Sequence, residues 1–223
     1  KYGDKHIVVD TLKQNIQHRD VSSGNADYEN REQYTADLIH QYALDWLDRQ
    51  EADKPFIGIF TYTLPHAELW QPNDSILQKY IQAFECDDSG FGGAFSSWYY
   101  KNSNRHAQFA AMITRLDTQV GEIFAKLEEK GLADNTLVIF TSDNGPHEEG
   151  GADPDWFNRD GLLRGTKRST HEGGIRVPFI VKGPGVPAGT VNDHQLAFYD
   201  LMPTLLDYAG LNGDAYSRKA STA

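Results

Sequence analysis

Helical segments alternate with short apolar segments along most of this chain, and that order restricts the fold more than any other feature. Apolar residues at helical spacing predict one helix over residues 34–47 and a longer one over Phe109–Leu127. Short, continuous apolar runs at Phe56–Tyr62, Thr136–Ser142 and Val177–Val181 predict buried strands. Alternating helices and strands are typical of an α/β protein with a mostly parallel sheet, which is the fold class that we predict.

The ends of the predicted elements carry matching local signals. Gly131 is suited to end the long helix, because glycine readily adopts the left-handed conformation that follows a helix. A last helix is predicted over Leu201–Ala209, with Asp200 as its cap and Pro203 tolerated in the first turn. Residues 67–104 show no clear periodicity, and we expect a long irregular insertion there that borders the site.

The overall charge argues against a nucleic-acid partner. The chain has 32 acidic and 21 basic residues, which gives a formal net charge of −11, whereas nucleic-acid binders are usually basic. An anionic substrate would also be repelled at long range, so an anion site here needs a local group of cations or a metal. The single cysteine excludes an internal disulfide and a zinc site of several cysteines. No apolar run is long enough to span a bilayer.

Polar residues follow two of the predicted strands. Asp143 and Asn144 come directly after the strand over Thr136–Ser142, and His66 follows the strand over Phe56–Tyr62. In parallel sheets ligands bind beyond the carboxyl ends of the strands, so these positions are candidates for a site. A carboxylate next to an amide oxygen suits Ca²⁺ or Mg²⁺. The simpler alternative is a turn, since Asp, Asn and Gly are the commonest turn residues.

Three further side chains have a functional and a simpler reading. Lys167 lies in a glycine-rich loop and would oppose negative charge on a leaving oxygen, although most lysines are only solvated surface residues. His66 would pass a proton to a leaving group, although a lone histidine is more often structural. His147 would line the same pocket and bind a substrate hydroxyl, or it is a loop histidine without a role.

Taken together and in this order, the motifs resemble those of the type I sulfatases. They are Thr63-Leu64-Pro65-His66, Thr141-Ser142-Asp143-Asn144-Gly145, Leu163-Arg164-Gly165-Thr166-Lys167 and Glu172-Gly173-Gly174-Ile175-Arg176-Val177-Pro178. The resemblance runs from about Tyr34 to Ala209, apart from the insertion. It implies an alkaline-phosphatase-like α/β sandwich, with a central, mostly parallel sheet flanked by helices. The stretch from Pro146 to Gly151 further resembles bacterial members that act on sulfated carbohydrates.

The resemblance also implies a role for each candidate residue. Asp143 and Asn144 match the positions of two ligands of one Ca²⁺. Lys167 matches the lysine that contacts the sulfate and the bridging oxygen, and His66 matches the histidine that contacts the sulfate and helps to protonate the departing alcohol. His147 falls where related carbohydrate sulfatases place a substrate-recognition residue, so we expect it to bind substrate.

One part of the family pattern is missing from this sequence. The nucleophile of the family is a formylglycine, made from Cys or Ser in a Cys/Ser-x-Pro/Ala-x-Arg motif. Cys86 is followed by Asp87-Asp88-Ser89-Gly90 and lacks both the Pro and the Arg, so we interpret it as a loop or packing cysteine. We therefore expect residues 1–223 to be a partial sulfatase domain, with the nucleophile in a segment that precedes it and residues 210–223 as a truncated tail. A degenerate homologue is the alternative.

The resulting hypothesis is hydrolysis of sulfate esters on a sulfated carbohydrate, with Ca²⁺ and a formylglycine from outside this chain. A phosphodiesterase or phosphonate monoester hydrolase of the same superfamily is the nearest alternative. A non-catalytic protein that binds sulfated glycans is the alternative from another class, and an α/β domain without a site is the simplest. The family resemblance favours a periplasmic or secreted location, and neither a nucleic acid nor a membrane span is expected.

Overall fold

The computed structural model describes residues 33–67, 69–84, 104–151, 153–158 and 161–211. The chain divides into two compact units, Lys1–Val186 and Pro187–Ala223. All of the predicted site residues belong to the first unit. No helix of the described residues is long and apolar enough to cross a membrane. That the whole chain forms a single partial catalytic domain stays a prediction.

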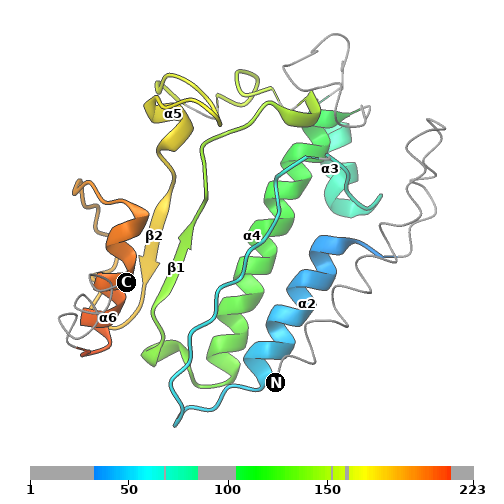
Figure 1. The fold of residues 1–223 in the computed structure, drawn as a ribbon. Coiled ribbons are helices and arrows are strands. Elements are labelled where there is room, and N and C mark those ends of the chain that lie inside the picture. Colours follow the sequence, from blue (N-terminus) through cyan, green and yellow to red (C-terminus); the bar gives the residue numbers. More distant parts are fainter. Residues whose placement is uncertain (1–32, 68, 85–103, 152, 159–160, 212–223) are drawn as a thin grey trace, which may run out of the picture. The chain divides into compact units, whose positions relative to one another are not determined.

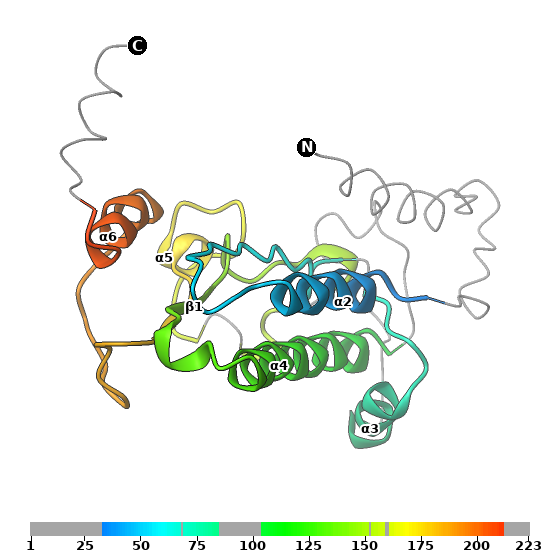
Figure 2. The same cartoon turned by 90° about the horizontal axis from the view of Figure 1, so that it is seen from below.

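Two long helices form the base of the first unit. Helix α2 (Thr35–Asp48) lies beside helix α4 (Arg105–Glu129), as both views show (Figures 1 and 2). Both helices were expected from the spacing of their apolar residues, and both are confirmed. Their contact surface is apolar because each helix turns a stripe of such residues toward the other. One cluster of buried apolar residues in this contact consists of Ala43, Leu47, Ile123, Leu127 and Leu132.

The end of α4 has the backbone geometry that Gly131 was expected to allow. Gly131 has a φ of 65°. Its N–H donates to the Glu128 carbonyl at 2.9 Å, and the Leu132 N–H donates to the Leu127 carbonyl at 2.8 Å. These two bonds form a Schellman motif, which satisfies carbonyl groups that the helix end would otherwise leave unpaired.

The segment Phe56–Tyr62, predicted as a buried strand, has no strand pairing within the described residues, so that prediction is wrong in its secondary structure. The backbone is extended and its side chains alternate. Phe56 and Phe60 pack edge-on against Trp46, each with 5.7 Å between ring centroids. Ile57 and Ile59 point away and are 81% and 82% exposed. No described strand pairs with this segment, so it is an extended coil, which Figure 1 shows between β1 and α4.

The described sheet has two strands, β1 (Val138–Thr141) and β2 (Phe179–Lys182). Both were predicted, but they pair antiparallel, with Thr141 opposite Phe179, whereas a mostly parallel sheet was expected. The physical reason is that the loop between them leaves and returns at the same end. The Gly145 N–H donates to the Gly174 carbonyl at 3.0 Å, which joins the two ends of that loop. The pair is therefore a wide hairpin and not a crossover unit.

The expected irregular insertion contains a regular helix, α3 (Ser75–Phe84). The Asp74 carboxylate accepts the Ile76 N–H at 3.0 Å and the Leu77 N–H at 3.2 Å, which caps the start of the helix. Leu77 is buried against Ala107 and Ala111 of α4. The expected insertion therefore contains a helix that packs onto α4. The stretch 85–103, which includes Cys86, lies outside the described residues.

In the second unit, the 3₁₀ turn η3 (Phe198–Asp200) leads into helix α6 (Leu201–Tyr208). This confirms the predicted last helix. The Asp200 carboxylate accepts the Ala197 N–H at 2.9 Å and makes no capping bond to α6. The cap that we expected from Asp200 is therefore wrong, because its side chain closes the preceding turn. Most of the predicted tail, residues 212–223, lies outside the described residues.

A buried histidine links α2, α4 and the extended segment. The Tyr62 hydroxyl lies 2.7 Å from His40 Nδ1, and His40 Nε2 lies 2.7 Å from the Glu122 carboxylate. A carboxylate only accepts, so His40 Nε2–H donates to Glu122 and the Tyr62 hydroxyl donates to Nδ1. Burial, and then the charge of Glu122, raise the pKa of Tyr62 to about 12.

We expect this hydroxyl to make stability fall at alkaline pH. An unfolded tyrosine loses its proton near pH 10, and Tyr62 keeps its proton up to about pH 12 in the fold. Its contribution is therefore complete below pH 10 and is lost as the pH rises toward 12. Denaturant unfolding of the whole protein at pH 9 and pH 12 should show a loss that is roughly 1–2 kcal/mol smaller in Tyr62→Phe. An equal loss in both proteins would contradict this contribution.

Candidate functional site

His66 and Lys167 meet although they are 101 positions apart in the sequence. His66 stands in the turn that follows the extended segment, where its N–H donates to the Thr63 carbonyl at 2.8 Å. Its Nδ1 lies 2.7 Å from the Ala67 carbonyl, which can only accept, so Nδ1 carries the proton. Nε2 is then the acceptor, and it receives an N–H from the Lys167 ammonium at 3.1 Å. The pair presents a cation and a defined imidazole nitrogen at one point.

Backbone contacts hold the Lys167 loop against the loop that follows β1. The Lys167 N–H donates to the Pro146 carbonyl at 2.7 Å, and the Gly173 N–H donates to the Arg164 carbonyl at 2.9 Å. The second contact folds the loop back on itself before the four-residue helix α5 (Glu172–Ile175). The Lys167 side chain is only 19% exposed. The lysine is therefore a held, largely buried cation, and the simpler reading of a solvated surface lysine does not fit.

A fully buried carboxylate lies behind this pair. Glu149, in the turn η2 (Glu149–Gly151), is 0% exposed. One of its oxygens lies 2.5 Å from Arg168 Nη1 and 3.4 Å from Lys167 Nζ, and the other lies 2.8 Å from His147 Nδ1. Burial alone would raise the pKa of Glu149, but the Arg168 bond and the charges of His147, Lys167 and Arg168 lower it overall. Glu149 is therefore an ionised carboxylate among cationic groups.

His147 is buried beside His66. Its Nε2–H donates to the Pro65 carbonyl at 2.9 Å, and its Nδ1 accepts the Glu149 backbone N–H at 3.1 Å and lies 2.8 Å from the Glu149 carboxylate. The two histidine rings are stacked, with 5.6 Å between centroids and 23° between planes. Both ring nitrogens of His147 are thus engaged by the chain itself, so its ring supports His66 in this geometry. A direct contact between His147 and a substrate hydroxyl stays a prediction.

Asp143 and Asn144 lie on the same pair of loops but do not touch His66 or Lys167 through any reported bond among the described residues. The Asp143 side chain is exposed and has no hydrogen bond or ion pair within that part of the chain. The Asn144 amide nitrogen donates to the Gly145 carbonyl at 2.8 Å, so the side-chain oxygen is the atom that would bind a cation. A free carboxylate next to an amide oxygen fits the oxygen ligands that Ca²⁺ prefers.

These two ligands do not complete a cation site by themselves. Ca²⁺ takes roughly six to eight oxygen ligands, and no group of three or more His, Cys, Asp or Glu residues in the described part of the chain is placed to hold a metal. The remaining ligands would have to come from outside those residues. The binding of Ca²⁺ by Asp143 and Asn144 therefore stays a prediction.

Sequence reasoning missed two members of this cluster, Glu149 and Arg168. The stretch that contains Glu149 was noticed only as part of a family resemblance. Two glycines follow this residue, with φ values of 68° and 84°, and they let the chain turn so that the carboxylate points inward. The glycine pair was the available signal of this turn. A glutamate is rarely buried unless it is paired with a cation, and that pairing cannot be seen in the sequence.

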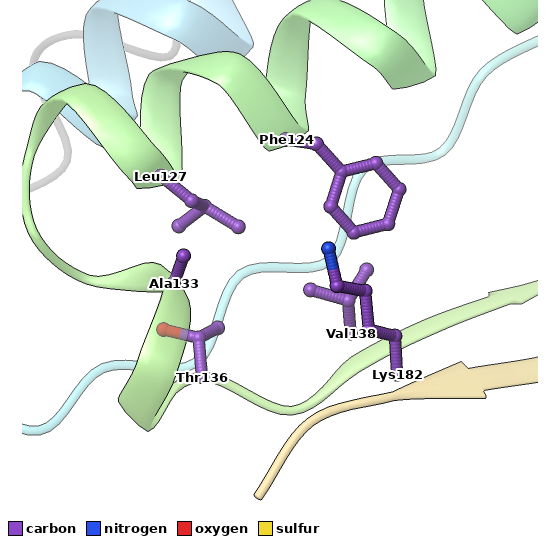
Figure 3. Close-up of a pocket in the computed structure, with 6 residues that line it drawn as sticks. All are labelled: Phe124, Leu127, Ala133, Thr136, Val138 and Lys182. Atoms are coloured by element: carbon purple, nitrogen blue, oxygen red, sulfur yellow. The ribbon is translucent and has the colours of Figure 1, made fainter. Parts of the chain in front are cut away.

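A small pocket elsewhere in the first unit contains none of the predicted site residues. It lies between the end of α4 and the start of β1, and Figure 3 shows the residues that line it. They are Phe124, Leu127, Ala133, Thr136, Val138 and Lys182. The Lys182 ammonium lies 4.6 Å from the centroid of the Phe124 ring, a cation–π contact that covers this apolar patch. His66 and Lys167 lie beyond the other end of β1, so this pocket is separate from the candidate site.

A comparison with protein families decides the assignment. The model of the family described as Sulfatase matches residues 3–211. The chain belongs to the sulfatase family. Family membership confirms the resemblance stated above, and it places the His66–Lys167 cluster within a family of known chemistry.

Two sulfatases show how far the sequence similarity extends. A steryl-sulfatase of Rattus norvegicus is 37% identical over 119 residues, 52% of this chain and 21% of that protein. An arylsulfatase of Clostridium perfringens is 30% identical over 191 residues, 76% of this chain and 37% of that protein. The chain therefore spans about a fifth to two fifths of the length of these relatives.

A solved structure supports the fold. The crystal structure of Ps i-CgsB in complex with k-i-k-neocarrahexaose is similar with a TM-score of 0.61 and 26% identity, over 82% of this chain and 36% of that one. This likeness fits an alkaline-phosphatase-like arrangement. The complete sandwich with a mostly parallel sheet stays a prediction, because the described residues contain only two strands.

Proposed function

We propose that the protein hydrolyses sulfate esters, and that its substrate is a sulfated carbohydrate. The observation that carries this proposal is the 3.1 Å contact between Lys167 Nζ and His66 Nε2. It joins a held cation to an imidazole nitrogen of defined tautomer, in a chain of the sulfatase family. The carbohydrate class is supported by the bound neocarrahexaose of the similar structure.

In the proposed reaction the bond between sulfur and the bridging oxygen breaks, and the departing alcohol takes up a proton. Lys167 binds a sulfate oxygen and the bridging oxygen, where its charge offsets the negative charge that develops. His66, once it carries a second proton at Nε2, delivers that proton to the departing oxygen, while the Ala67 carbonyl accepts from Nδ1–H. Lys167, which donates to Nε2 in this structure, then donates to the ester oxygens instead. These two residues are the catalytic residues that this chain contributes.

Two groups that the family uses are not among the residues assigned here. Ca²⁺, bound in part by Asp143 and Asn144, would withdraw charge from the sulfate oxygens. A formylglycine from outside this chain would supply the attacking oxygen. We also propose a secreted or periplasmic location, on the family resemblance alone.

Rates on matched substrates test the proposal. The whole protein should hydrolyse 4-nitrophenyl sulfate at least roughly 10²-fold faster than 4-nitrophenyl phosphate or bis(4-nitrophenyl) phosphate, because the phosphate monoester carries a second negative charge and the diester carries a second ester group that a sulfate monoester lacks. Faster hydrolysis of either phosphate would favour the phosphodiesterase or phosphonate monoester hydrolase alternative. Binding of sulfated oligosaccharides without release of sulfate would favour a non-catalytic glycan-binding protein. Release of sulfate from steryl sulfate but not from sulfated saccharides would reject the carbohydrate class.

A further inference from the structure

Glu149 stands out among the charged residues of the described chain because it is fully buried and its carboxylate lies against Lys167, Arg168 and the ring of His147. Isolating an ionised carboxylate from water is costly, so such a group persists only where its partners compensate for the lost hydration. The partners come from two loops, because His147 follows β1 and Lys167 and Arg168 belong to the loop that precedes α5. One carboxylate therefore joins both loops at the candidate site.

The two oxygens of Glu149 act on two sides of the catalytic pair. One oxygen lies 3.4 Å from Lys167 Nζ, and the ammonium also donates to His66 Nε2. An ammonium has three N–H donors, so among the described residues one remains for a bound anion. The other oxygen faces His147, whose ring stacks on His66 and whose Nε2–H holds the Pro65 carbonyl next to it.

From this arrangement we propose that Glu149 is a positioning residue that sets the geometry of Lys167 and His66 toward the leaving oxygen of the ester. The inference rests on the proposed sulfatase function and deepens it. Glu149 does not reach the substrate, since it has no exposed surface. It acts by fixing the ammonium through one carboxylate oxygen, and it meets the stacked histidine pair through its other oxygen and through its backbone N–H, which donates to His147 Nδ1 at 3.1 Å. Its lowered pKa, which keeps it ionised, agrees with this role.

The dependence of rate on the leaving group separates positioning from a general structural role. Poor leaving groups need more charge stabilisation and more proton transfer than good ones. In Glu149→Gln, kcat should therefore fall by roughly 10²-fold on phenyl sulfate, but by only about 10-fold on 4-nitrophenyl sulfate, with KM little changed, because a misplacement near 1 Å can cost that much. A structural defect that merely reduces the active fraction would lower both rates by the same factor.

A neighbouring residue provides the matched control. Glu148→Gln makes the same chemical change one position earlier, and its amide oxygen can still accept the Thr166 hydroxyl, now 3.2 Å from the carboxylate. We expect Glu148→Gln to keep the wild-type ratio of kcat on phenyl sulfate to kcat on 4-nitrophenyl sulfate. Equal losses on both substrates in Glu149→Gln, or the same change of ratio in Glu148→Gln, would overturn the proposal.

A second variant decides the question if Glu149→Gln does not fold. Glu149→Asp keeps the charge and withdraws the carboxylate by one methylene group. It should change the ratio of the two rates in the same direction, by roughly 3-fold to 10-fold. An unchanged ratio in a folded Glu149→Asp overturns the proposal. The failure of the proposed function looks different, since wild-type protein would then release no sulfate from either ester.

Discussion

Lys167→Ala in the whole protein should lower kcat for an aryl sulfate by roughly 10²-fold or more, because it removes a fixed cation from the position where charge develops. The ammonium is 19% exposed and donates to His66, so water replaces it poorly. If the lysine binds the sulfate equally in the ground state, KM rises as well. Initial rates over a range of 4-nitrophenyl sulfate concentrations separate the two parameters.

The fold should survive this change. Glu149 would still have Arg168 at 2.5 Å and His147 at 2.8 Å, so its carboxylate is not left alone. Lys167→Arg should not restore the rate, since a planar guanidinium is not a substitute for a compact ammonium at such a point. Lys54→Ala is a suitable control, because Lys54 is 66% exposed and pairs only with Glu51 among the described residues. Activity of Lys167→Ala within a few-fold of wild type would reject the catalytic role.

The sequence predicted α2, α4 and α6 because their signal is local, whereas α3 was not expected. The apolar stripe of α4 and the stop at Gly131 depend on residues within a few turns of one another. The run Phe56–Tyr62 was read as a strand, and its extended backbone and inward Phe56 and Phe60 agree with that. Whether an extended segment becomes a strand depends on a neighbour, however, and apolar character alone does not reveal one. The direction of pairing between β1 and β2 depends on the loop between them in the same way.

The candidate site was predictable where it follows strand ends and not where it depends on burial. His66 and Lys167 were chosen for their chemistry, and the structure brings them to 3.1 Å. Asp143 follows β1 as expected, and its role stays a prediction. Glu149 was missed because its importance arises from contacts with residues up to 19 positions away, which only the folded loops create. A sequence motif does not reveal which residues of such a cluster are buried.

The loops that carry the site pack backbone against backbone, and glycines allow it. A Cβ added at Gly173 would lie 2.0 Å from the Gly165 carbonyl oxygen, and one added at Gly145 would lie 1.9 Å from the Gly173 carbonyl oxygen. Both distances are far shorter than any normal contact. The obstructing atoms belong to the backbone, so no side-chain rotation relieves the clash. An alanine at Gly173 must therefore open the loop that carries Lys167, and one at Gly145 must move the loop after β1 away from Gly173.

Gly173→Ala should accordingly lose roughly 1–3 kcal/mol of unfolding free energy, and kcat should fall by more than about 10-fold because the loop that ends at Lys167 must move. Gly121→Ala is the matched control. Gly121 lies on the exposed side of α4 with nothing within 4 Å of an added Cβ, so this alanine should raise helix stability by roughly 0.5–1 kcal/mol and leave kcat unchanged. Denaturant unfolding and initial rates of both variants give the comparison. If Gly173→Ala were as stable and active as Gly121→Ala, the loop that carries Lys167 could not be closed as tightly as the site requires, and the placement of Lys167 beside His66 would lose its structural basis.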